Sequence, residues 1–178
     1  TYFGWVDGTF RMLDESEIDS SILAAIGGAI AWIFAPLGWG NWQATVASIT
    51  GLVAKENIVG TLGILYGGGD GSVYDAMAAA FTGITGYSFL VFNLLCAPCF
   101  AAIGAIKREM NNAKWTWFAI GYQCGFAYVI GLMINQFGNL FAGSANILGV
   151  IVAVILLAGL IYMLCRPYKE ATKLSAKV

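Results

Sequence analysis

The chain has 178 residues, of which 59% are hydrophobic and 11% charged, whereas soluble domains average about 45–50% and about 25%. This composition excludes an ordinary soluble domain, because so few charged side chains cannot cover a surface in water. The net charge of −1, without a basic stripe, argues against nucleic acid as a partner. Histidine is absent, which removes the commonest acid–base group and metal ligand near neutral pH. We therefore expect the lipid bilayer as the solvent.

Charge divides the chain into three parts. Residues 1–20 form an acidic, polar lead-in, residues 21–165 are predominantly apolar, and residues 166–178 form a basic tail. The middle part has room for about four to five membrane spans and a short interfacial segment. The sequence predicts an all-α, polytopic membrane bundle with short or broken gate helices. Because the chain begins with Thr1 and no signal peptide is visible, we expect it to be the C-terminal part of a longer protein.

The first apolar runs are irregular. As a helix, residues 22–37 would cover about 24 Å, less than a hydrocarbon core of about 30 Å. This run is expected to be tilted, re-entrant or a half-helix. Residues 42–66 are long enough to span but carry Lys55 and Glu56 near their middle. Residues 74–81 are too short to span and are expected at an interface.

Three later runs reach the length of a spanning helix, residues 87–107, 115–137 and 145–165. Lysine and arginine gather between the first and second of these runs and again after the third, whereas residues 138–144 carry no charge. Cytoplasmic loops carry the excess of Lys and Arg. The basic loop and the tail are therefore expected inside the cell, and residues 138–144 outside.

Lys55 and Glu56 are the first candidates for function. An ionisable residue at the centre of a bilayer costs about 2.5–3.5 kcal/mol on insertion scales, so such residues usually face protein or a wet cavity. Adjacent helix positions do not face each other, which predicts different partners for the two. Two interpretations stay open. The residues are structural charges that other helices neutralise, or they line a polar pathway.

Cys96 and Cys99 are the second candidates. Positions i and i+3 share a helix face, so both thiols are expected at one spot. Pro98 lacks a backbone N–H and so frees the carbonyl of Leu94. Thiols beside exposed carbonyls suit a soft or borderline divalent cation, whereas the alternatives are plain packing around a kink or a thiol–disulfide enzyme. The other two cysteines are expected to be packing residues: Cys124 and Cys165. Uncharged polar residues within the spans are expected to bond across helices: Asn93, Gln123, Asn135 and Gln136.

Several motifs together resemble the bacterial ferrous iron transport protein B (FeoB) family. They are APLG at 35–38, GLVAKENIV at 51–59 and APCFAAIGAIKRE at 97–109, followed by WTW at 115–117 and GYQ at 121–123. The second and third blocks are specific in combination, and all five occur in the family's order. The resemblance implies a multi-pass protein of the bacterial inner membrane that transports Fe²⁺.

The resemblance also implies roles for residues and partners. Cys99 matches the family's gate cysteine, a proposed Fe²⁺ contact, and Lys55 and Glu56 match its Ala-Lys-Glu motif. The family does not regularly place a cysteine at position 96, so Cys96 is expected to be a secondary contact only because it shares a helix face with Cys99, and Pro98 is expected to break the helix. Fe²⁺ is cargo rather than a cofactor. GTP and Mg²⁺ would bind an N-terminal GTPase domain that this chain lacks, so the chain itself is not expected to be an enzyme.

The expected partners are the bilayer, the GTPase domain and first gate repeat of the transporter, and further copies of the chain in a homo-oligomer. Two other functions stay open at this point. One is a gate-domain transporter of an organic solute such as a nucleoside. The other is a membrane accessory subunit that transports nothing.

Overall fold

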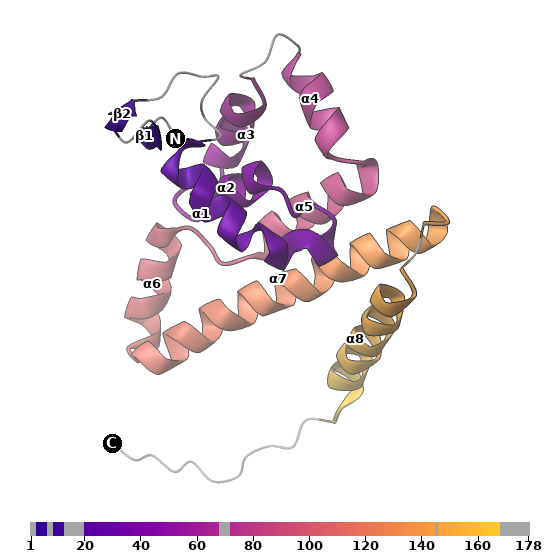
Figure 1. Cartoon of the computed structure of the whole chain (residues 1–178). Helices are drawn as coiled ribbons and strands as arrows, with labels where there is room; N and C mark the ends of the chain where they lie inside the picture. Colours follow the sequence, from indigo (N-terminus) through magenta and orange to yellow (C-terminus); the bar gives the residue numbers. More distant parts are fainter. Residues whose placement is uncertain (1–2, 7–8, 13–19, 68–71, 145, 168–178) are drawn as a thin grey trace.

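The computed structural model describes residues 3–6, 9–12, 20–67, 72–144 and 146–167 (Figure 1). Strands β1 (Phe3–Val6) and β2 (Thr9–Met12) pair antiparallel in the lead-in, a hairpin that the sequence analysis did not foresee. All other described elements are helices, so the predicted all-α membrane fold is confirmed. The acidic residues of 13–19 and the tail after residue 167 lie outside the described residues.

The first apolar run forms half of a sharply bent pair. Helix α1 (Ile22–Ala31) tightens into the 3₁₀ helix η2 (Trp32–Leu37), and α2 (Trp42–Gly51) follows at an angle of 96°. Pro36 inside η2 cannot continue an α-helical ladder, and Gly38 turns the chain with a φ of +91° that favours glycine. This geometry fits a broken span or a re-entrant loop, in agreement with the half-helix interpretation.

The expected single span over residues 42–66 is wrong, because the chain leaves the helix after Gly51. Turns closed by hydrogen bonds between residues three apart follow, and α3 (Asn57–Gly67) begins after them. Lys55 lies in this break, where its side chain can reach the backbone of another helix. An ammonium group at membrane depth needs such partners, and a continuous α-helix, whose carbonyls are already bonded, offers few of them.

A second break divides the next run. After α4 (Val73–Ala80), helix α5 (Gly83–Leu95) starts with a capping box formed by Thr82 and Thr85. Residues 96–99 are not helical, and α6 (Phe100–Met110) begins directly after them. The break coincides with the proline of the Cys-Ala-Pro-Cys sequence, as the sequence predicts.

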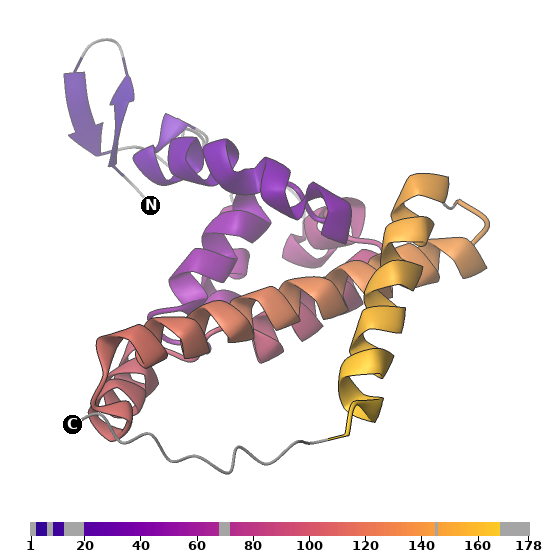
Figure 2. The ribbon, with the colours of Figure 1, turned by 90° about the horizontal axis from the view of Figure 1, so that it is seen from below.

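The last two spans are continuous. Helix α7 (Ala113–Phe141) begins two residues before the predicted start and absorbs four residues of the predicted loop, and α8 is Ile147–Cys165. Three of the described helical runs are long and apolar enough to cross a membrane, or four if the bent pair counts as one span. Figures 1 and 2 show α6 and α8 at opposite ends of α7.

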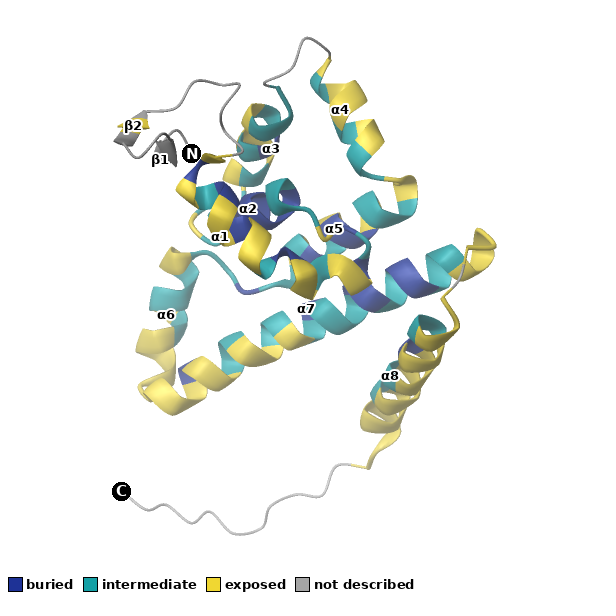
Figure 3. Ribbon diagram, viewed as in Figure 1, coloured by how far each residue is buried: buried dark blue, intermediate teal, exposed yellow. Residues whose placement is uncertain are grey.

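The core lies where η2 and α5 pack on the middle of α7, and Ala44 and Ala47 of α2 belong to the same cluster (Figure 3). Trp39, just after the η2 turn, is 1% exposed and stacks on Phe34 at 4.5 Å, with Phe89 and Phe92 of α5 against its other sides. Ser88 of α5 donates a 2.8 Å hydrogen bond to a backbone carbonyl of α7. The core therefore holds the turn between the bent helices against α5 and α7.

Helix α8 is the least buried of the long helices. Its side chains are almost all exposed or half-buried, although its mean hydropathy of 2.9 is the highest of the three candidate spans. It contacts α7 near its first turns, where Gly149 lies directly against the amide of Gln136. An apolar helix that is exposed all round faces lipid or other transmembrane helices.

Candidate functional site

The two helix breaks meet and are bonded to each other. The backbone N–H of Phe100, the first residue of α6, donates to the carbonyl of Leu52 at the end of α2 at 3.1 Å. In the opposite direction, Lys55 Nζ donates to the carbonyl of Leu94 at 3.0 Å and lies 3.5 Å from the carbonyl of Cys96. Each break thus satisfies backbone groups that the other break exposes.

The freed carbonyl is the one that the sequence predicts. Leu94 lies four residues before Pro98, which has no N–H to donate to it. An unpaired carbonyl inside a membrane costs free energy, and Lys55 supplies the missing donor as a cation. The expectation that Lys55 finds a polar partner on another helix is confirmed.

Glu56 behaves differently from its neighbour. Its side chain is exposed at the same break, and no hydrogen bond or ion pair joins it to another residue of the described ranges. The two adjacent ionisable residues therefore have different surroundings, as expected. We expected Glu56 to meet either a polar protein group or water, and within the described part of the chain no protein group bonds to it.

The four cysteines are arranged differently from the prediction. Cys96 ends α5 and Cys99 begins α6, so the expectation that they share one helical face is wrong, because the helix is interrupted between them. The Sγ atom of Cys96 instead lies 3.6 Å from Sγ of Cys124 on α7. Cys124 is therefore not an isolated packing residue, whereas Cys165 is exposed at the end of α8. The spacing of 28 residues gives no signal for this pair without knowledge of how α5 packs on α7.

No cluster of three or more His, Cys, Asp or Glu side chains comes together within the described ranges. A closed structural cage of the zinc type needs four such ligands. What the break offers a cation instead is a mixture of thiols and backbone carbonyls, the kind of site that broken helices form in transporters.

Polar side chains of α7 hold the turn of the bent helix pair. Asn135 and Gln136 both donate to the carbonyl of Pro36 at 3.0 Å, so the predicted bonding across helices is confirmed for these two. Asn93 bonds within its own helix, and the side-chain oxygen of Gln123 is buried without a partner. Sequence alone did not show which carbonyl the amides would find.

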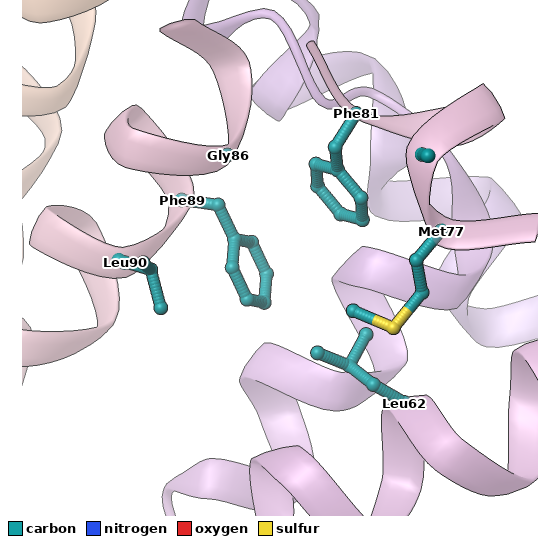
Figure 4. A pocket seen from close by; sticks show the side chains of 7 residues that line it. Leu62, Met77, Phe81, Gly86, Phe89 and Leu90 are labelled. Atoms are coloured by element: carbon teal, nitrogen blue, oxygen red, sulfur yellow. The ribbon is translucent and has the colours of Figure 1, made fainter. Parts of the chain in front are cut away.

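Cavities flank the core in the part of the chain that the structure describes, and two of them lie against α5. The first, about 280 Å³, lies among α2, α5 and α7, and Ser48, Cys96 and Cys124 are part of its wall. The second, about 290 Å³, lies among α3, α4 and α5 (Figure 4). Its labelled lining is apolar, with Leu62, Met77 and Phe89 pointing toward the same space. The thiol pair therefore lines one cavity and no thiol lines the other.

These features define a membrane gate domain, in which two interrupted helical runs meet and are hydrogen-bonded at their breaks. The chain belongs to the Gate family, described as nucleoside recognition, which it matches over residues 12–113, and it corresponds to part of the membrane region of FeoB proteins. It is a multi-pass membrane protein. No solved structure matches it.

The similar proteins are named as iron transporters. The Fe(2+) transporter FeoB of Methanocaldococcus jannaschii is 41% identical over 123 residues, 69% of this chain and 18% of the relative. FeoB of Staphylococcus aureus strain COL is 36% identical over 125 residues, 70% of this chain and 19% of the relative. A Porphyromonas gingivalis Fe(2+) transport protein A/FeoB fusion protein is 30% identical over 146 residues, which are 74% of this chain and 17% of the relative. The chain thus spans about a fifth of these relatives' length.

Proposed function

We propose that this chain forms the gate and part of the Fe²⁺ pathway of a ferrous iron transporter. The observation that carries the proposal is the meeting of the two helix breaks, where the Lys55 ammonium bonds to the carbonyl of Leu94, which Pro98 leaves without a helical donor, and to the carbonyl of Cys96. The place where the two breaks meet therefore already binds a cationic group, the ammonium of Lys55. The function that the relatives are named for, Fe(2+) transport, supplies the cargo.

In this mechanism Lys55 closes the gate. Carbonyl oxygens that attract an ammonium group also attract Fe²⁺, and Lys55 competes with the metal for them. When Lys55 withdraws, the carbonyls of Leu94 and Cys96 face the pathway, and the thiol of Cys99 at the start of α6 contacts the ion transiently. Thiolate beside carbonyl oxygen suits Fe²⁺, and an incomplete ligand set lets the ion leave.

Partners beyond this chain complete the transporter. The relatives extend far beyond the matched region, and we assign to those parts the GTP-binding domain and the first gate repeat. GTP and Mg²⁺ bind there, so this chain is a conduit and not an enzyme. Glu56 at the exposed side of the break collects Fe²⁺ at the mouth of the pathway.

The test of the proposal is uptake of Fe²⁺ at limiting concentration by cells that express the complete transporter. Cys99→Ser keeps the size of the side chain but replaces a thiolate with a much poorer soft-metal ligand, so uptake is expected to fall. Cys165→Ser, at the exposed end of α8, is the matched control and should transport normally. Unchanged uptake by Cys99→Ser at equal expression would refute an iron contact at this residue.

A second variant tests the ionisable residue at the mouth. Glu56→Leu removes the carboxylate from an exposed position, so little packing is lost and reduced uptake reports the charge. Ile58→Ala, two residues later, changes packing without charge and is the comparison. Equal effects of the two substitutions would show that Glu56 has no role in collecting the ion.

The family's description, nucleoside recognition, favours one alternative cargo, an organic solute such as a nucleoside. Proteoliposomes with the complete transporter separate the two functions. Uptake of radiolabelled uridine without uptake of Fe²⁺ would show that the cargo is a nucleoside and not iron. Fe²⁺ uptake that excess uridine leaves unchanged supports the iron pathway.

A further inference from the structure

The cavity among α2, α5 and α7 contains two groups that the gate mechanism does not use. One is the pair of thiols, Cys96 at the end of α5 and Cys124 on α7, with sulfur atoms 3.6 Å apart. All four cysteines of the chain are free. The other is Ser48 of α2, which is part of the wall of the same cavity of about 280 Å³. The two groups come from three helices and face one space.

The spacing of the thiols fits a tetrahedral metal ion. With metal–sulfur bonds of about 2.3 Å, sulfur atoms 3.6 Å apart subtend an angle of about 103° at the metal, close to the tetrahedral value. A linear two-coordinate ion would need the sulfur atoms about 4.6 Å apart at the same bond length. The distance between the two sulfur atoms therefore suits a borderline divalent ion such as Fe²⁺, Co²⁺ or Zn²⁺. Both thiolates could bind such an ion without a movement of α5 or α7.

Ser48 points to a ligand independently of the thiols. Its side chain is 8% exposed, and its hydroxyl oxygen is buried without a hydrogen-bond partner. Helical hydroxyls usually bond to a carbonyl three or four residues earlier, and Thr45 and Thr50 of the same helix do so at 2.8 Å and 2.9 Å. A buried polar atom without a partner destabilises the folded protein. A bound ion in the adjoining cavity would remove that destabilisation.

We propose that Cys96, Cys124 and Ser48 form a binding site for a thiophilic divalent cation, separate from the gate cysteine Cys99. On binding, each thiol loses its proton to water, and the two thiolates balance the charge of the ion. Lys55, which contacts the carbonyl of Cys96, is the charged neighbour of the site, and its positive charge favours the thiolates but weakens the binding of the ion. The protein supplies three ligands, and water completes the coordination, so the ion remains exchangeable.

The experiment titrates the complete protein, reduced and in lipid nanodiscs, with Co²⁺ alone as the probe. Thiolate ligation gives a sulfur-to-cobalt charge-transfer band, and the intensity of the visible bands reports tetrahedral geometry. The band is expected in the unmodified protein and in Cys165→Ser, the matched control for cysteine number. It should be lost in Cys96→Ser and in Cys124→Ser. Ser48→Ala should keep the band but require more Co²⁺.

Two outcomes would overturn the inference, and they leave the transport proposal standing. One is the absence of a band in the unmodified protein with four titratable thiols. The other is a band that Cys124→Ser keeps and Cys99→Ser loses, which would assign the thiolate to the gate. Loss of Fe²⁺ uptake in Cys99→Ser with an intact cobalt band would support both proposals as separate sites.

A measurement without substitutions guards against variants that do not fold. In the unmodified protein, Cd²⁺ should protect Cys96 and Cys124 together from alkylation by N-ethylmaleimide, as read by mass spectrometry of the peptides. Cys165, exposed at the end of α8, should stay reactive throughout. Protection of neither Cys96 nor Cys124 would overturn the site.

Discussion

Replacing Lys55 with methionine should open the gate. Methionine keeps an unbranched stem of similar length but carries no charge and no donor. In the closed arrangement the ammonium donates to the carbonyl of Leu94 at 3.0 Å, and this contact crosses between the two helix breaks. The substitution removes it while the backbone bond from Phe100 to Leu52 stays. The variant therefore weakens the closed gate without separating the two breaks.

The size of the effect follows from the geometry. A hydrogen bond to a charged group contributes about 1.5–3 kcal/mol. The second contact, 3.5 Å to the carbonyl of Cys96, is longer than an ordinary N–H···O bond and adds little. Because Lys55 is only partly buried, the lower end applies, about 1.5–2 kcal/mol. If the closed state alone makes this contact, the equilibrium shifts toward the open state by about 10- to 30-fold.

The assay is Fe²⁺ entry into proteoliposomes that contain the complete transporter, followed by quenching of a trapped dye without nucleotide. Lys55→Met should show a basal Fe²⁺ leak, and Lys55→Arg, which keeps a cation, should leak less. Lys114→Met, at the exposed start of α7, is the matched control for a lost lysine and should not leak. A Lys55→Met leak no greater than that of Lys114→Met would refute the idea that Lys55 holds the gate closed.

Two other predictions concern the turn of the bent helix pair and the orientation. Gly38→Ala should lower the free energy of unfolding by about 2–5 kcal/mol, the sum of a left-handed backbone and a Cβ 2.5 Å from an amide oxygen of α7. A Cβ at position 28 would meet no neighbouring group within 4 Å. Gly28→Ala should therefore leave the free energy of unfolding unchanged or raise it in the same detergent titration. For orientation, an impermeant maleimide should label Ser144→Cys in intact cells and Lys114→Cys only after permeabilisation. The reverse pattern would invert the predicted topology.

The sequence was most informative where a single residue determines the backbone. Pro98 predicts both a helix break and a free carbonyl at Leu94, because a missing N–H has a fixed consequence four residues earlier. The long apolar runs predict spans by length alone. Each of these conclusions depends on local geometry, which needs no knowledge of how helices pack.

The sequence was misleading where helices from distant parts of the chain meet. Residues 42–66 have the composition of one span, but Lys55 in the break bonds to carbonyls about forty residues later, and no local pattern shows that these two segments lie together. The pairing of Cys96 with Cys124 likewise depends on the register of α5 against α7. Periodicity within one helix carries no information about either contact.

The amide of Gln136 couples two helices that do not belong to the same part of the bundle. The amide nitrogen of Gln136 donates to the carbonyl of Pro36 in η2. The amide oxygen of the same side chain lies directly against Gly149 of α8. If α8 turned about its axis, a bulkier side chain would replace Gly149 and occupy the position of the amide. Gln136 would then have to release Pro36. The peripheral helix α8, most of whose surface faces away from the core, can therefore act on the bent helix pair through one side chain.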